Sequence, residues 1–162
     1  MHEPTWFKFG ESEECLVTKR GGRQGCRLGG RLFNATYSVA LQEIHERLKK
    51  YGIVLSLPYS ASWGICDDAT IVVAVDATFR DDEAILITSR NPLKVVEKIP
   101  VTAAVVDEVL TAYGNQVNFK KGKTEVITSL RGKNAGQARS ILRNEEFKVK
   151  FDSDDRAIHV VS

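Results

Sequence analysis

Apolar residues recur three or four positions apart in two long stretches of the chain, and this spacing predicts two helices. The first stretch carries its apolar stripe at Phe33, Tyr37, Ala40, Leu41, Ile44, Leu48 and Tyr51. Gly52 follows directly and predicts the end of that helix. The second begins at Asn91-Pro92, a cap followed by a first-turn proline, and reaches Gly114. We expect Pro100 to kink or interrupt it.

Short apolar runs between polar stretches predict strands. Residues 71–75 and 84–88 flank the polar stretch 79–83, which predicts a β-hairpin with adjacent carboxylates in its turn. Further strands are predicted at residues 16–18, 53–57, 117–119 and 124–130, with a basic helix over 132–144 and a final hairpin over 147–151 and 157–161. Antiparallel strands backed by helices on one face make an α+β domain.

Length and composition narrow the class of protein. The chain has 162 residues, 43% of them hydrophobic and 27% charged, which fits one globular domain. It contains no run of 18 apolar residues and opens without the pattern of a secretory signal, so we expect no membrane partner. Cys15, Cys26 and Cys66 are odd in number and widely spaced, which favours an intracellular, reducing compartment, nucleus or cytoplasm.

Charge is distributed unevenly although the net charge is only +2. Residues 19–31 contain five basic side chains and no acid, and residues 120–143 contain seven against Glu125. Residues 67–83 reverse the balance, with six acids and Arg80. Two basic segments on either side of an acidic one suit a polyanion held over a metal ion, although solvated loops are an equally good reading of charge runs.

The predicted turn at residues 79–83 is the first candidate for chemistry. Asp81 and Asp82 are adjacent carboxylates whose mutual repulsion a divalent cation would relieve, although most such pairs are solvated turn residues. A second pair, Asp67-Asp68, competes for the same interpretation. His45 lies between charged neighbours and is most simply a surface residue.

Two further segments invite a phosphate-binding interpretation. Residues 19–30 are basic, contain five glycines and lead directly into a helix, which suits phosphate or a nucleotide edge. Gly122-Lys123-Thr124 is part of a phosphate-loop pattern, but Val117 stands where that pattern needs glycine and a strand follows instead of a helix. The nucleotide-hydrolase interpretation is therefore rejected.

Taken together, these segments resemble the palm of a reverse transcriptase of the non-LTR retroelement type. Residues 21–28 are similar to that family's motif B, Phe79-Arg80-Asp81-Asp82 to motif C, and residues 117–124 to motif D. The resemblance covers roughly residues 16–130, and residues 131–162 follow as a C-terminal helix and hairpin. It implies a palm-like antiparallel sheet backed by helices on one face, in a single partial domain over residues 1–162.

For function, the resemblance implies template-directed DNA synthesis in the intact enzyme. Two metal ions, Mg²⁺ or Mn²⁺, would promote transfer of a deoxynucleotide to a primer on an RNA or DNA template. Asp81 and Asp82 would be the metal-binding carboxylates. The other implied site residues would contact nucleotide or nucleic acid: Phe79 at the primer end, Gln24 and Gly25 at the nascent base pair, Lys123 at the leaving phosphates, and Arg20, Arg23 and Arg27 at the backbone.

The sequence also departs from the family. Residues 1–18 contain no aspartate, so the motif A carboxylate that completes the metal site is absent, and we expect neither fingers nor thumb. Arg27 replaces the usual proline, and Arg80 can pair with either neighbouring aspartate. We therefore expect weak metal binding and no activity from this chain alone. A non-catalytic module that binds nucleic acid or another partner, or a decayed remnant, remain alternatives.

Overall fold

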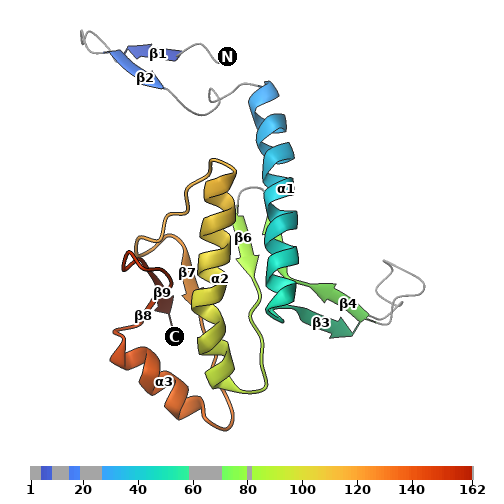
Figure 1. Cartoon of the computed structure of the whole chain (residues 1–162), viewed down its shortest axis with the longest axis vertical. Helices are drawn as coiled ribbons and strands as arrows, with labels where there is room; N and C mark the ends of the chain where they lie inside the picture. The colour runs from blue at the N-terminus through green and yellow to red at the C-terminus, as the bar shows by residue number, and fades with distance from the viewer. Residues whose placement is uncertain (1–4, 9–14, 19–26, 59–70, 80–81, 162) are drawn as a thin grey trace. The chain divides into compact units, whose positions relative to one another are not determined.

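The computed structural model describes residues 5–8, 15–18, 27–58, 71–79 and 82–161 (Figure 1). The described part is a mixed α+β structure with three helices and several small sheets. The chain divides into two compact units, Met1–Val39 and Ala40–Ser162, which are considered separately. Among the helices that are described, none is long and apolar enough to cross a membrane.

The first unit contains a short hairpin and the beginning of a helix. Strand β1 (Thr5–Lys8) pairs antiparallel with β2 (Cys15–Thr18), which confirms the strand predicted at residues 16–18. The predicted helix after the glycine-rich segment is present as α1 (Arg27–Lys50), but it begins at Arg27, so the last residues of that segment, including Gly29 and Gly30, belong to the helix. On it the rings of Phe33 and Tyr37 stack with their centroids 5.3 Å apart.

Helix α1 continues into the second unit and ends where the sequence predicts. The backbone N–H of Gly52 donates to Lys49 O and that of Ile53 to Leu48 O, both at 3.0 Å. This is a Schellman ending, which needs a residue with positive φ at the glycine position, and Gly52 has φ +64°. Leu48 and Ile53 are both buried, so this helix ending also places two apolar side chains in the interior.

Helix α2 (Pro92–Ala112) is capped as the sequence predicts but is not interrupted. The side chain of Asn91 accepts a hydrogen bond from the N–H of Leu93 at 3.1 Å. Pro100 lies inside the helix, so the expected interruption there is wrong. A proline removes one helical hydrogen bond, but its neighbours Ile99 and Ala103 bury their side chains on the same helix, and that burial outweighs the loss.

The hairpin predicted around residues 79–83 is present. Strand β5 (Asp76–Phe79) pairs antiparallel with β6 (Asp82–Ile85). The preceding strand β4 (Ile71–Ala74) pairs instead with β3 (Leu55–Pro58). The apolar run 71–75 was expected to form the first strand of this hairpin. Instead it pairs with β3 and ends at a bend at the buried Val75, and the hairpin strand is Asp76–Phe79.

The last sheet differs from the antiparallel expectation. Its elements in chain order are β7 (Glu125–Ile127), α3 (Ala135–Asn144), β8 (Lys148–Lys150) and β9 (Ala157–Val161). The strand order is β7-β9-β8, with β9 parallel to β7 and antiparallel to β8. The final hairpin is therefore confirmed, but a single antiparallel sheet is not, and residues 117–119 form no strand.

Residues 117–119 do not pair with any of the described strands; instead, Phe119 packs its side chain against the core. The ring of Phe119 lies 4.6 Å from that of Phe151, and Phe119 packs against the core. That core joins α2, α3 and the last sheet. Its buried members are Ile99, Ala103, Leu130, Ala135, Ala138, Leu142, Ile158 and Val160.

One ion pair fastens the last hairpin to α2. Arg156 Nη1 lies 2.8 Å from Asp107 Oδ2, and the Asp107 side chain is only 8% exposed. Arg156 also pairs with Asp152 and lies over the Phe151 ring at 5.4 Å. Partial burial works against ionisation of Asp152, but hydrogen bonds and the charge of Arg156 lower its pKa overall. The buried carboxylate of Asp107 thus has its counter-ion on the neighbouring hairpin.

The end of α3 generates a stability prediction. Phe147 N–H donates to Leu142 O and Glu146 N–H to Arg143 O, which places Glu146, with φ +52°, at the position usually filled by glycine. We expect Glu146→Gly to raise the free energy of unfolding by about 0.5 kcal/mol, because relief of left-handed strain exceeds the added freedom of the unfolded chain. Urea denaturation followed by circular dichroism measures it.

Glu145→Gly is the matched control for that substitution. Glu145 has φ −86°, which any residue adopts without strain. Glycine there adds only unfolded-state freedom and should lower stability by about 0.5–1 kcal/mol. Equal destabilisation by the two substitutions would contradict the strain argument.

Candidate metal centre and polar network

The register of the β5–β6 hairpin brings two acids to one face. Thr78 is opposite Glu83, and Asp76 is opposite Ile85. Because side chains two positions apart on a strand share a face, Asp76 and Glu83 are diagonal neighbours across the pair. Both are half-buried. The hairpin therefore carries a second acidic set besides the predicted Asp81 and Asp82.

Helix α1 adds a histidine to this pair. His45 Nε2 lies 2.9 Å from Asp76 Oδ1, and the two side chains are 29% and 12% exposed. The expectation that His45 is a simple surface residue is therefore wrong. It directly follows the fully buried Ile44 on α1 and is itself half-buried.

The three side chains form a group that could hold a metal ion. One ligand atom each from His45, Asp76 and Glu83 lie within 4.8 Å of one another. Imidazole nitrogen and carboxylate oxygen are both common metal ligands. The alternating pattern of the predicted hairpin could have paired the two acids, but nothing in the sequence links them to His45, 31 positions before Asp76.

The site residues implied by the resemblance to a reverse transcriptase are not those of the His45, Asp76 and Glu83 group. Asp82 begins β6 and is paired in register with Phe79, so the connection between the strands consists of Arg80 and Asp81. Arg27 is the first residue of α1. Several of the predicted residues lie outside the described part of the chain: Arg20, Arg23, Gln24, Gly25 and Asp81, as well as the competing Asp67 and Asp68.

Lys123 lies on an exposed turn, as expected for a basic loop. Its backbone N–H donates to Lys120 O at 3.0 Å, and Gly122 N–H donates to Glu125 Oε1 at 2.7 Å. Gly122 has φ +80°, which glycine adopts readily. The turn thus holds the Lys123 side chain at the surface of the second unit.

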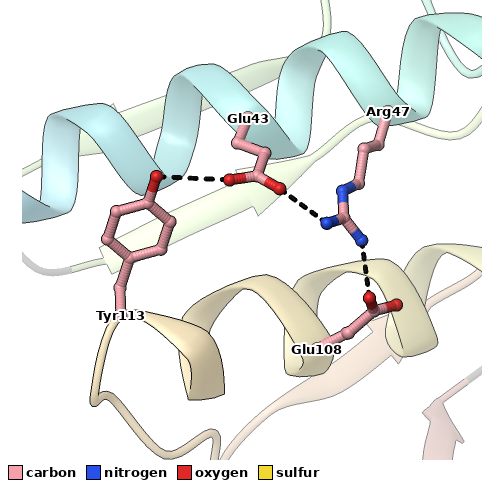
Figure 2. A network of polar contacts seen from close by, with 4 residues as sticks. All are labelled: Glu43, Arg47, Glu108 and Tyr113. Atoms are coloured by element: carbon pink, nitrogen blue, oxygen red, sulfur yellow. Dashed lines mark hydrogen bonds and ion pairs between the residues drawn. The ribbon is translucent and has the colours of Figure 1, made fainter.

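A network of four polar side chains joins α1 to α2 (Figure 2). Arg47 lies between two carboxylates, with Nη2 2.6 Å from Glu43 Oε1 and Nη1 2.8 Å from Glu108 Oε1. Tyr113 donates its hydroxyl hydrogen bond to Glu43 Oε2 at 3.2 Å. Glu43 and Arg47 lie four residues apart on α1, and the contact of Arg47 with Glu108 extends this pair to a second helix. The hydrogen bonds that Arg47 donates to Glu108 and then to Glu43 raise the pKa of Arg47.

A basic hollow lies between α3 and residues 128–131, the segment that follows β7. It has a volume of about 260 Å³ and is lined by Thr128, Ser129, Leu130, Arg131, Arg139, Leu142, Arg143 and Phe147. Arg139 donates a hydrogen bond to Leu130 O, which holds this side chain across the hollow. The three arginines belong to the basic segment 120–143 noted in the sequence, and the fold gathers them round one concavity.

Comparisons with known proteins assign neither a family nor a fold. The chain matches no protein-family model, no curated protein and no solved structure. A function must therefore be argued from three local features: the β5–β6 hairpin, the group at His45, and the basic hollow.

The network in Figure 2 predicts a shifted titration of Tyr113. Desolvation, followed by the hydrogen bond and negative charge of Glu43, raises the pKa of Tyr113 above its ordinary value. We expect Glu43→Gln to lower that pKa while leaving the part caused by desolvation. Two-dimensional NMR of the Tyr113 ring during a pH titration measures it. Glu97→Gln, on the exposed side of α2, is the control and should leave the titration unchanged.

Proposed function

We propose that the chain is the palm segment of a reverse transcriptase of the non-LTR type. The observation that carries this proposal is the register of the β5–β6 hairpin, in which Phe79 pairs with Asp82 across a connection of Arg80 and Asp81. The order along this hairpin of an aromatic residue, one further residue and two aspartates resembles motif C.

The order of the elements supports the same proposal. A glycine-rich basic segment leads directly into α1, as motif B leads into a helix. After the hairpin, α2 intervenes before the basic turn that carries Lys123, the motif D position. Each of these features alone is common, and their sequence along one chain is the stronger support.

The residue types at the proposed site suit Mg²⁺. Asp81 and Asp82 offer only carboxylate oxygens, the ligands that Mg²⁺ prefers. In the intact enzyme the ion would stabilise the charge that develops during phosphoryl transfer. Phe79 would support the primer end, Gln24 and Gly25 would contact the nascent base pair, and Lys123 would approach the leaving phosphates. Without a third fixed carboxylate, the isolated chain would bind Mg²⁺ weakly and would not polymerise.

A second candidate is a non-catalytic module that binds nucleic acid. The observation that favours it is the basic hollow, where Arg131, Arg139 and Arg143 line one concavity. Guanidinium groups bind phosphate oxygens in bidentate fashion, and such contacts confer affinity that does not depend on base sequence. This candidate needs neither a metal ion nor Asp81.

The two candidates differ in how Mg²⁺ affects binding of a primed RNA template with a deoxynucleotide. For the palm segment we expect Mg²⁺ to strengthen binding, and Asp81→Asn with Asp82→Asn to remove that gain. Asp67→Asn with Asp68→Asn is the matched control and should retain it. Fluorescence anisotropy of a labelled primer measures the affinity. Absence of any Mg²⁺ effect, or its loss in the control alone, contradicts the assignment of Asp81 and Asp82.

For the binding module, the expected signature is salt dependence without metal. Each phosphate contact contributes about 0.7–0.9 to the slope of log affinity against log salt. Arg131→Gln with Arg143→Gln should therefore reduce that slope by roughly 1.5. Arg139 is kept because it hydrogen-bonds the backbone. The control pair Arg90→Gln with Lys94→Gln removes two exposed cations away from the hollow and should leave the slope unchanged. Equal slopes for both pairs would exclude the hollow as the binding surface.

A further inference from the structure

We propose that His45, Asp76 and Glu83 bind one divalent transition-metal ion of the zinc type. This group shares no residue with the proposed Mg²⁺ ligands Asp81 and Asp82. It does not depend on the chain being a polymerase, because it follows from the contact between His45 of α1 and Asp76 of the β5–β6 hairpin. Its donors come from α1 and from both strands of the hairpin, so a bound ion would join the helix to the hairpin.

The distances leave room for such an ion after small side-chain adjustments. Ligands at about 2.1 Å from a tetrahedral zinc lie about 3.4 Å from one another. In the structure the three ligand atoms lie within 4.8 Å, and His45 Nε2 is 2.9 Å from Asp76 Oδ1. Changes of about 1 Å, within the reach of side-chain rotation, would place all three at bonding distance. A water molecule would fill the fourth position.

The donor set selects the class of ion. Mg²⁺ and Ca²⁺ prefer all-oxygen sites, and Mg²⁺ gives up its water reluctantly. An imidazole nitrogen beside two carboxylates favours zinc and its neighbours in the first transition series. We therefore expect Zn²⁺ to bind more tightly than Mn²⁺, and Mg²⁺ least of the three.

Charge supports the same conclusion. Asp76 and Glu83 are diagonal neighbours on one face of the hairpin, and both are half-buried, where repulsion between carboxylates is poorly screened. A divalent ion bound between them would reduce this repulsion, and the imidazole nitrogen of His45 would supply a third donor.

The supports of the site are already in place on the helix side. Glu43 and Arg47, two positions before and after His45, contact Tyr113, the residue that follows α2, and Glu108 of α2, respectively. Immediately before His45, the fully buried Ile44 fixes the rotation of α1 at this point. Residues held by packing and hydrogen bonds lose little freedom on binding metal, which raises affinity.

Metal binding to the full chain tests the proposal. Isothermal titration with Zn²⁺, Mn²⁺ and Mg²⁺ should give one Zn²⁺ per chain and no binding of Mg²⁺ at the same concentrations. His45→Gln and Glu83→Gln should each weaken Zn²⁺ binding about tenfold or more, since even loss of a residue behind a ligand costs that much. Zn²⁺ should also raise the melting temperature of the unaltered chain and not that of the two variants.

The cysteines and His159 supply the controls. His159→Gln, on β9, is matched to His45→Gln and should leave Zn²⁺ binding unchanged. Co²⁺ bound in place of Zn²⁺ should show ligand-field absorption without a thiolate charge-transfer band, which separates this site from Cys15, Cys26 and Cys66. Glu83→Gln keeps the size of the side chain, so retained folding by circular dichroism makes its result decisive. Unchanged Zn²⁺ affinity in both site variants, or a thiolate band, would overturn the proposal.

Discussion

The second unit depends on α2 running unbroken through Pro100. One set of its side chains, including Ile99 and Ala103, lies in the core shared with α3 and the last sheet. Farther along, Asp107 receives Arg156 from the C-terminal hairpin, while Glu108 and Tyr113 reach α1. A break at Pro100 would separate the core contact of Ile99 from that of Ala103 and from these polar contacts. The free energy of burial on both sides of the proline therefore keeps the helix continuous and holds its neighbours in place.

Local signals in the sequence predict the ends of elements well, because each end is determined by a few adjacent residues. Asn91-Pro92 and Gly52 mark a helix start and a helix stop in the chain itself, and the structure has both. The consequences of long-range packing are not predictable in this way. The helical proline, the failure of residues 117–119 to form a strand, and the parallel pairing of β7 with β9 each depend on what packs against the segment, which no local pattern records.

The candidate sites also differ in whether local sequence or long-range packing determines them. The turn at Phe79–Asp82 is predictable from sequence, since a polar stretch between apolar runs favours a hairpin. The register then follows from the length of the connection, and it places Asp76 and Glu83 together. His45 is different, because only the packing of α1 brings it to the hairpin. The β5–β6 hairpin thus carries two groups of acids. Asp81 and Asp82, the metal ligands of the polymerase proposal, offer oxygen donors alone. Asp76 and Glu83 form a group with His45, which adds a nitrogen donor.

The position of β9 has a consequence for how the chain acquires its structure. β9 is the central strand of its sheet, with β7 on one side and β8 on the other, yet it is the last described strand in the chain. During synthesis, β7 and β8 have no partner until residue 161 has left the ribosome. Ile158 and Val160 also complete the core. Helices α1 and α2 can form from local contacts as they emerge, whereas this sheet and the core beneath it must assemble after translation of β9.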